Sequence, residues 1–146
     1  VTLPGLHHGA VSEKGAAWLD RMLAAEPSRP TIVMMHQPPF DSGVPYLDLY
    51  SCRDSHRLAE VVARHPQVEL IVCGHVHRFM QVRFGGTMLC TAPSTTTAIA
   101  LRLRPEAKPA SHVEPPALLL HHWQAGVGLI THFVPIGTFP GPYPFA

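Results

Sequence analysis

Two short apolar runs, each ending just before a histidine, constrain the fold of this chain more than any other feature. The first run covers residues 31–35 and is followed by His36; the second covers residues 70–73 and is followed by Gly74 and His75. A short unbroken apolar run is typical of a strand buried on both faces of a sheet. Histidines placed where such strands leave the sheet would lie at one edge, in position to act as metal ligands.

Helical periodicity precedes each of these runs. Apolar spacing predicts a helix over residues 13–26 with Ser12 as its N-cap, and a second helix that Asp54 caps and Pro66 ends. The second strand is predicted over residues 69–73, and the segment from Asp41 to about Cys52 as a loop. The order helix, strand, helix, strand predicts an α/β layer with crossover connections.

The second half of the chain has a different character. Two hairpins are predicted, the first turning at Gly85-Gly86, because paired glycines adopt the positive φ values of a tight turn. Their four strands are expected over residues 79–84, 87–91, 117–123 and 127–134. We therefore divide residues 1–146 into an α/β core part (1–104), a proline-rich connection (105–116), and a hairpin with a tail (117–146).

Composition excludes several classes of partner. Eleven basic and ten acidic side chains give a net charge of +1, which provides no electrostatic basis for binding a nucleic acid or a membrane surface. Residues 115–146 contain no Asp, Glu, Lys or Arg, but histidines, glycines and prolines interrupt them, so we do not predict a membrane span. With 46% hydrophobic and only 14% charged residues, a large buried or partner-covered surface is expected.

The three cysteines are an odd number without paired spacing, so a disulfide framework is not predicted and a reducing, cytoplasmic compartment is favoured. In an extended segment, His75 and His77 would point to the same side about 6.5–7 Å apart. That separation suits two ions joined by a bridging carboxylate. An alternative is a zinc site that also uses Cys73, which strand alternation places on the same face.

These residues resemble the late motifs of the calcineurin-like binuclear metallophosphoesterases, which here stand as His36-Gln37-Pro38-Pro39 and Gly74-His75-Val76-His77. The likeness is greatest to the bacterial branch of class III cyclic-nucleotide phosphodiesterases and glycerophosphodiesterases, in which Gly-His-Val-His-Arg-Phe and a hairpin-rich C-terminal region occur. The resemblance runs from about Leu3 to Phe133. It implies the C-terminal half of a metallophosphoesterase β-sandwich flanked by helices, with C-terminal β-hairpins.

The resemblance also implies a site and a reaction. His36 and His75 would bind one divalent metal ion (Fe, Mn or Zn) and His77 a second one, for hydrolysis of a cyclic nucleotide or a glycerophosphodiester. Arg78 is a candidate for binding the substrate phosphate, although a solvated arginine is an equally good interpretation. Gln37 stands where many relatives have a second histidine and is expected to affect substrate contacts.

The family's earlier motifs, Asp-x-His, Gly-Asp-x-x-Asp and Gly-Asn-His, have no counterpart in this sequence. Three imidazoles without a bridging carboxylate should hold two metal ions poorly, because such ions favour anionic oxygen ligands. We predict partial metal occupancy and little activity for the chain alone. We also expect a homo-oligomer or pairing with the missing N-terminal half. The alternative is a non-catalytic binding or oligomerisation module derived from the same fold.

Overall fold

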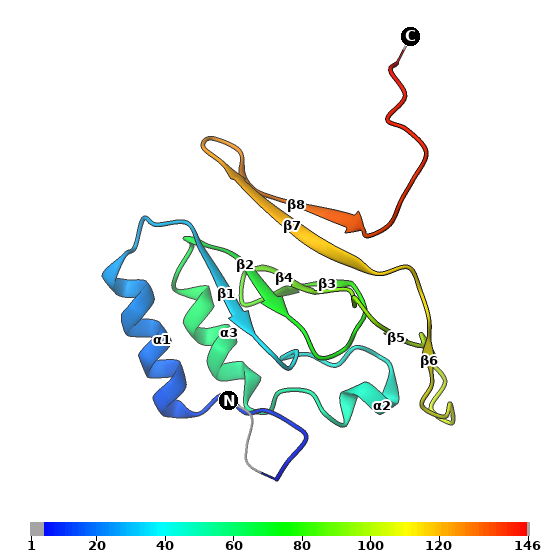
Figure 1. The fold of residues 1–146 in the computed structure, drawn as a ribbon. Helices are drawn as coiled ribbons and strands as arrows, with labels where there is room; N and C mark the ends of the chain where they lie inside the picture. The colour runs from blue at the N-terminus through cyan, green and yellow to red at the C-terminus, as the bar shows by residue number, and fades with distance from the viewer. Residues whose placement is uncertain (1–4, 146) are drawn as a thin grey trace.

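The computed structural model describes residues 5–145, and a four-stranded mixed sheet forms the centre of the molecule (Figure 1). Its strand order is β1 (Thr31–Met35), β2 (Val68–Cys73), β4 (Thr87–Thr91) and β3 (Met80–Phe84). β1, β2 and β4 are parallel, whereas β3 and β4 form the antiparallel hairpin predicted around Gly85-Gly86. The α/β class is confirmed.

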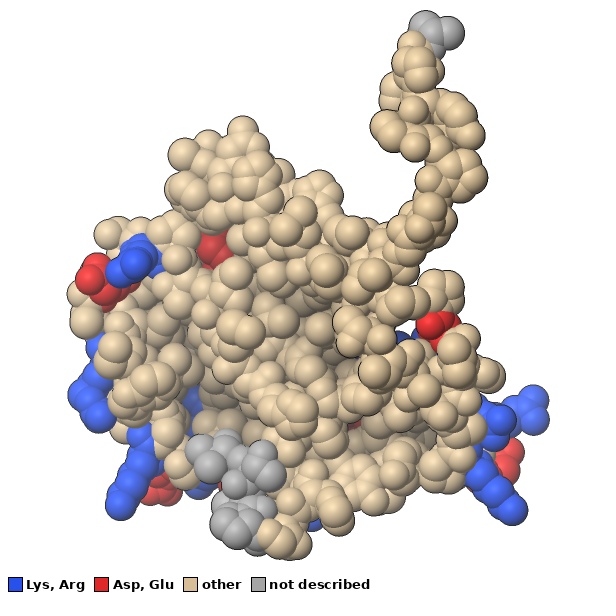
Figure 2. Space-filling model, viewed as in Figure 1, with Lys and Arg blue, Asp and Glu red and all other residues tan. Residues whose placement is uncertain are grey.

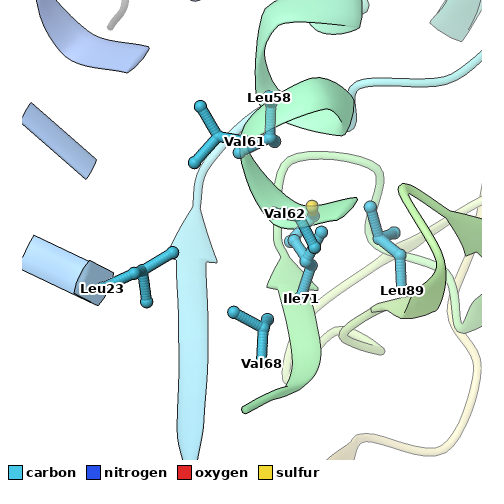
Figure 3. Close-up of a cluster of buried hydrophobic side chains, with 8 residues drawn as sticks. Leu23, Leu58, Val61, Val62, Val68, Ile71 and Leu89 are labelled. Atoms are coloured by element: carbon cyan, nitrogen blue, oxygen red, sulfur yellow. The ribbon is translucent and has the colours of Figure 1, made fainter. Parts of the chain in front are cut away.

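Two helices, α1 (Glu13–Ala25) and α3 (Ser55–Ala63), lie side by side and pack against the sheet (Figure 1). The core between them consists of buried side chains from both helices and from the two central strands (Figure 3): Leu23, Leu58, Val61, Val62, Val68, Ile71, Cys73 and Leu89. Burial of each large apolar side chain stabilises the fold by about 1.5–3 kcal/mol. This core fixes the positions at which the parallel strands end.

Local signals explain where α1 begins. The Ser12 hydroxyl accepts a hydrogen bond from the Gly15 amide at 3.1 Å, as the N-cap prediction requires. At the second helix the reason for the start differs from the prediction. Asp54 precedes α3 with a left-handed φ of 54° and makes no side-chain cap hydrogen bond; its carboxylate lies 3.2 Å from the Arg57 guanidinium instead.

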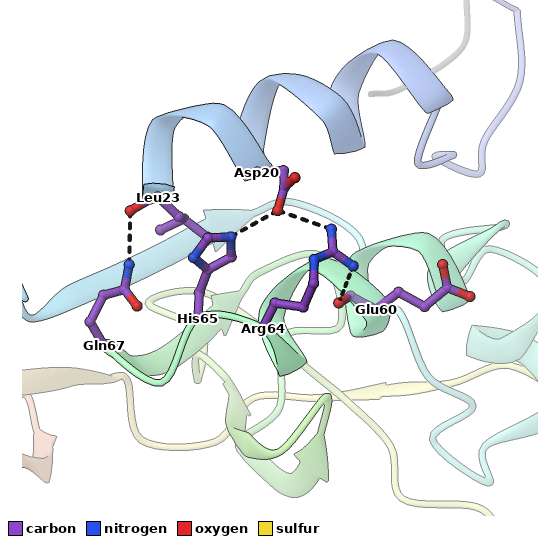
Figure 4. A network of polar contacts seen from close by, with 6 residues as sticks. All are labelled: Asp20, Leu23, Glu60, Arg64, His65 and Gln67. Atoms are coloured by element: carbon purple, nitrogen blue, oxygen red, sulfur yellow. Dashed lines mark hydrogen bonds and ion pairs between the residues drawn. The ribbon is translucent and has the colours of Figure 1, made fainter. Parts of the chain in front are cut away.

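A polar network joins α1 to the end of α3 (Figure 4). Asp20 lies 2.8 Å from Nε2 of His65 and 2.9 Å from the Arg64 guanidinium, and the Gln67 amide donates to the Leu23 carbonyl at 2.9 Å. The hydrogen bond to His65, followed by that to Arg64, lowers the pKa of Asp20 below its usual value. The network therefore joins the two helices by one ion pair, between Asp20 and Arg64, and by hydrogen bonds from the segment that follows α3.

The prediction that both strands are buried on two faces is correct for β2 and wrong for β1. In β2, Leu70 and Ile71 point to opposite faces and are 4% and 0% exposed. β1 is an edge strand on which Ile32 is 36% and Met34 80% exposed. The physical reason is alternation: Val33 and Met35 pack against the core, so Ile32 and Met34 point to the opposite face of the sheet, which is open at this strand.

Two short elements lie in segments expected to be irregular. The predicted loop 41–52 contains the four-residue helix α2 (Pro45–Asp48). In the proline-rich connection, β6 (Ser111–His112) pairs with β5 (Ala98–Ile99).

The C-terminal hairpin, formed by β7 (Ala117–Gln124) and β8 (Gly128–Pro135), has the predicted antiparallel pairing, and β8 packs next to β2. Residues 136–145 extend away from the body (Figure 1). In Figure 2 this tail carries no Lys, Arg, Asp or Glu, whereas such residues gather at the margins of the body. No helix within residues 5–145 is long and apolar enough to cross a membrane.

Candidate functional site

The candidate site lies where β1 and β2 end side by side. Their parallel register pairs Met35 with Cys73, and the Gly74 amide donates to the His36 carbonyl at 3.0 Å just beyond the last pair. His75 and His77 have positive φ values of 68° and 51°. Positive φ is uncommon for residues other than glycine, so the backbone here departs sharply from the strand direction.

His36 and His75 meet at this edge. Nδ1 of His75 lies 3.3 Å from Nε2 of His36, and the ring centroids are 5.0 Å apart at an interplanar angle of 71°. Two nitrogens that bind one tetrahedral ion through bonds of about 2.0–2.1 Å are separated by about 3.3 Å. The distance therefore fits a hydrogen bond between the two rings, and it is also the spacing of two ligands on a single metal ion.

His77 is held by a different contact. Its Nδ1 lies 3.0 Å from the carbonyl oxygen of Thr97, so Nδ1 carries the proton and donates it to that carbonyl. Histidines that bind metals usually make such a bond with the nitrogen that does not face the ion. The contact leaves Nε2 of His77 as the nitrogen with a lone pair.

The electrostatics of His75 favour its neutral form. Burial lowers the pKa of His75, and the charges of His36 and His77 lower it further. A neutral imidazole is the form that binds a metal ion. At neutral pH His75 is therefore in the protonation state that a ligand needs.

Within residues 5–145, no group of three or more His, Cys, Asp or Glu side chains could hold a metal ion. The assignment of His36, His75 and His77 as ligands accordingly stays a prediction. Cys73 does not add a ligand in this structure, since its side chain lies in the core cluster and is 1% exposed. Burial, with the neighbouring Cys90 and Cys52, raises the pKa of the Cys73 thiol to about 12, which keeps it protonated.

The two candidate substrate-binding residues both have protein surroundings. The Arg78 guanidinium donates from Nε to the Ile99 carbonyl at 2.8 Å and lies 2.9 Å from the Glu114 carboxylate. Gln37 is 6% exposed and lies beneath Gly9, where an added Cβ would be 2.7 Å from the Gln37 side-chain oxygen. Neither contact tests a role in substrate binding, so these assignments also remain predictions.

A cavity of about 170 Å³ lies beside His77. Its lining combines residues that follow the second histidine motif with distant ones, including Arg78, Phe79, Ser94, Thr96, Glu114 and Phe133. Sequence analysis did not identify the distant residues as part of a site. Glu114 lies in a proline-rich connection and Phe133 in a hairpin strand, and neither belongs to a recognisable motif.

Comparison with known proteins gives a consistent result. A model of the calcineurin-like phosphoesterase family matches residues 3–79. A probable glycerophosphodiester phosphodiesterase of Arcobacter nitrofigilis is 35% identical over 145 residues, which is 99% of this chain and 53% of the relative. The glycerophosphodiester phosphodiesterase of Enterobacter lignolyticus is 28% identical over 142 residues, which is 97% of this chain and 50% of the relative.

A 3',5'-cyclic adenosine monophosphate phosphodiesterase of Escherichia coli K12 is 37% identical over 91 residues, which is 62% of this chain and 33% of the relative. The chain spans about half the length of the two glycerophosphodiester phosphodiesterases and a third of the length of this relative.

Proposed function

The chain belongs to the calcineurin-like phosphoesterase family, and on that premise we propose that residues 1–146 form the C-terminal portion of a longer metal-dependent phosphodiesterase. The contact between His36 and His75 carries the proposal, because two imidazole nitrogens 3.3 Å apart at the ends of parallel strands have ligand spacing. The three-part division into residues 1–104, 105–116 and 117–146 belongs to the same proposal.

We assign the metal ligands as the resemblance implies. His36 and His75 would hold one divalent ion, and Nε2 of His77 would hold a second one. A pair of Fe, Mn or Zn ions supplies Lewis acidity and lowers the pKa of water, which is the chemistry that phosphodiester hydrolysis needs. This chain would contribute the orientation of three imidazole donors, with the Thr97 carbonyl fixing the ring of His77.

Carboxylate ligands would have to come from the part of the longer protein outside this chain. Within residues 5–145 the histidines form no complete metal-binding group. We therefore expect partial metal occupancy and little hydrolysis by the chain alone.

Of the two substrate classes, we favour glycerophosphodiesters over cyclic nucleotides. The relatives named as glycerophosphodiester phosphodiesterases match 97% or more of the chain, including the C-terminal hairpin. The relative named as a cyclic AMP phosphodiesterase matches 91 residues. A match of 91 residues that includes His36 ends before Phe133. It therefore leaves out a residue that lines the cavity beside His77.

The test is to titrate the chain with Mn²⁺ by calorimetry, alone and after adding the remaining half of a relative's domain. Hydrolysis of bis(p-nitrophenyl) phosphate is assayed in the same samples. We expect weak binding and no hydrolysis by the chain alone, and both to increase after the addition. His75→Ala should reduce Mn²⁺ affinity by more than the ~10–100-fold that loss of an outer partner costs.

His122→Ala is the matched control, because His122 is an exposed histidine on the hairpin strand β7. Equal losses for the two histidine variants would overturn the assignment. So would hydrolysis that is insensitive to His75→Ala.

A second candidate function is oligomerisation without catalysis. It is favoured by the uncharged C-terminal region, on which Leu120, Phe139 and Tyr143 are 54%, 60% and 75% exposed. No strand within residues 5–145 pairs with the outer edge of β1, and such an edge also invites pairing with another copy or with the missing half. Light scattering that reports a monomer at all concentrations would rule out the homo-oligomer. The convergence of His36 and His75 favours the catalytic proposal, because a non-catalytic module does not need two imidazole nitrogens at ligand spacing.

A further inference from the structure

The cavity beside His77 is the feature that the metal site leaves unexplained. It has a volume of about 170 Å³, and His77 forms part of its wall. The other walls come from the start of the β3–β4 hairpin, from the segment 93–98, from the connection before β7, and from β8. A group bound to an ion at His77 would therefore have this cavity as its neighbour.

The volume indicates the size of group that this cavity can surround. An engineered protein cavity of about 150 Å³ accommodates benzene, a molecule of six non-hydrogen atoms. Glycerol also has six, whereas a nucleoside has about three times as many. The cavity is thus matched in size to a small alcohol, and a nucleoside placed there would extend beyond it.

The lining offers hydrogen bonds rather than an apolar surface alone. The Glu114 carboxylate and the Arg78 guanidinium lie 2.9 Å apart at its wall, so an acceptor and a donor are adjacent. The hydroxyls of Ser94 and Thr96 lie 3.1 Å apart and add groups that can both donate and accept. A vicinal diol, each of whose hydroxyls donates and accepts, would satisfy such a set.

The charge and the remaining walls restrict the ligand further. Arg78 is 19% exposed and paired with Glu114, so the cavity carries a positive and a negative group in contact rather than one excess charge. This favours a neutral group over a second phosphate. Phe79 and Phe133, with ring centroids 5.9 Å apart, offer apolar surface to the carbon atoms of the ligand.

We propose that this cavity, bounded by Arg78, Ser94, Glu114 and Phe133, is a subsite for the neutral hydroxylated alcohol of a phosphodiester, of glyceryl size. The inference rests on the proposed function for the identity of the phosphodiester. The binding of the alcohol itself requires neither metal nor hydrolysis. In this view the C-terminal hairpin contributes to specificity by closing one side of the cavity.

The test follows backbone amide NMR signals of the metal-free chain during titration with glycerol, with ethanol and adenosine at matched concentrations as comparisons. We expect glycerol to shift the amides of residues 77–79, 94–98 and 114, and the comparison compounds to leave them in place. Glu114→Gln should weaken glycerol binding by about 10-fold or more, as for loss of a hydrogen bond to a charged group. Ser94→Leu should abolish it by filling the cavity.

Glu106→Gln is the control for the loss of a carboxylate, because Glu106 is exposed and lies in the same connection without lining the cavity. Unchanged signals with glycerol would overturn the subsite. So would equal shifts by ethanol or adenosine, or shifts that persist in both cavity variants. Failure of the Mn²⁺ assays with glycerol binding intact would remove the hydrolase proposal and leave the alcohol site. Loss of glycerol binding with hydrolysis intact would remove the alcohol subsite and leave the hydrolase proposal.

Discussion

The strands of the helix-covered sheet and of the β7–β8 hairpin are both paired along their length, but their side chains are buried to very different extents. Ile71 and Leu89, on the two central strands, are 0% exposed. On the hairpin, Leu118, Leu120 and Phe133 are 42%, 54% and 50% exposed. A two-stranded hairpin is at best marginally stable in water without a packed face. The comparison teaches that β-ladder hydrogen bonds alone do not indicate where the stability of this chain resides.

This difference assigns separate tasks to the two regions. The core under α1 and α3 should supply most of the free energy of unfolding, because that is where large apolar side chains leave water. The hairpin should contribute little to it and should instead shape the surface beside His77, where Phe133 lines the cavity. Four substitutions, taken from the largest expected effect to the smallest, test this division.

The largest effect is expected from Leu89→Ala, which would leave a cavity at a fully buried position of β4. Such substitutions reduce the free energy of unfolding by about 2–5 kcal/mol. Leu120→Ala on the exposed face of β7 is the matched change and should stay within about 0.5 kcal/mol. Urea unfolding of both variants gives the values. Comparable losses would break the division between the two regions.

The second test compares the two hairpin turns. Gly85 and Gly126 have φ values of 57° and 81°, so Ala is strained at both, by about 1–3 kcal/mol. Only at Gly85 would the new Cβ also meet backbone, 2.9 Å from the Ala59 carbonyl oxygen on α3; at Gly126 it meets nothing within 4 Å. Gly85→Ala should therefore lower the thermal midpoint more than Gly126→Ala does, as measured by circular dichroism. The reverse order would contradict the close packing of this turn on α3.

A third substitution probes the contact between the regions. Phe133→Leu removes the ring that faces Phe79 at a centroid distance of 5.9 Å. Loss of an aromatic pair costs about 0.5–1.5 kcal/mol, and we expect the lower half of that range because Phe133 is half exposed. Glycerol binding at the adjacent cavity should weaken clearly. A change in stability with no change in binding would show that Phe133 only packs.

The smallest effect is expected from Asp20→Asn, and it should depend on pH. Its partners depress the pKa of Asp20 in the folded state, so the stabilisation is present above the unfolded pKa of about 3.9 and is lost as pH falls through the lower folded value. The variant should have a lower thermal midpoint than the parent chain at pH 6, and the difference should shrink below pH 4. Glu106→Gln, on the exposed connection, should leave the thermal midpoint unchanged both at pH 6 and below pH 4. A difference that grows towards low pH would have the wrong sign.

Features with a local cause were predicted well from the sequence. Ser12 caps the start of α1 as predicted, and the predicted run 31–35 is β1. Gly85-Gly86 marked the β3–β4 turn correctly. In each case the signal lies within a few residues of the feature that it specifies.

Features that depend on distant partners were not predictable in the same way. Nothing within residues 31–35 tells that β1 lies at the sheet edge, because strand order is decided by the other strands. The two-residue strands β5 and β6 are too short to produce a periodic pattern.

The candidate site divides along the same line. The motifs identified His36 and His75 as neighbours at the strand ends, and the structure places their rings in contact. The hydrogen bond from His77 to Thr97 and the presence of Glu114 beside Arg78 depend on how the chain returns after residue 93. The role of His36, His75 and His77 as metal ligands stays a prediction, since no complete metal-binding group is found within residues 5–145.

The open face of β1 provides a natural chemical reporter. Met34 projects from that strand and is 80% exposed, so its thioether should be oxidised by dilute hydrogen peroxide in the free chain. A polypeptide that covers this face of β1 would shield it. Peptide mass mapping of Met34 sulfoxide would then show, without a label or an activity assay, whether the chain is free or bound to a partner that covers Met34.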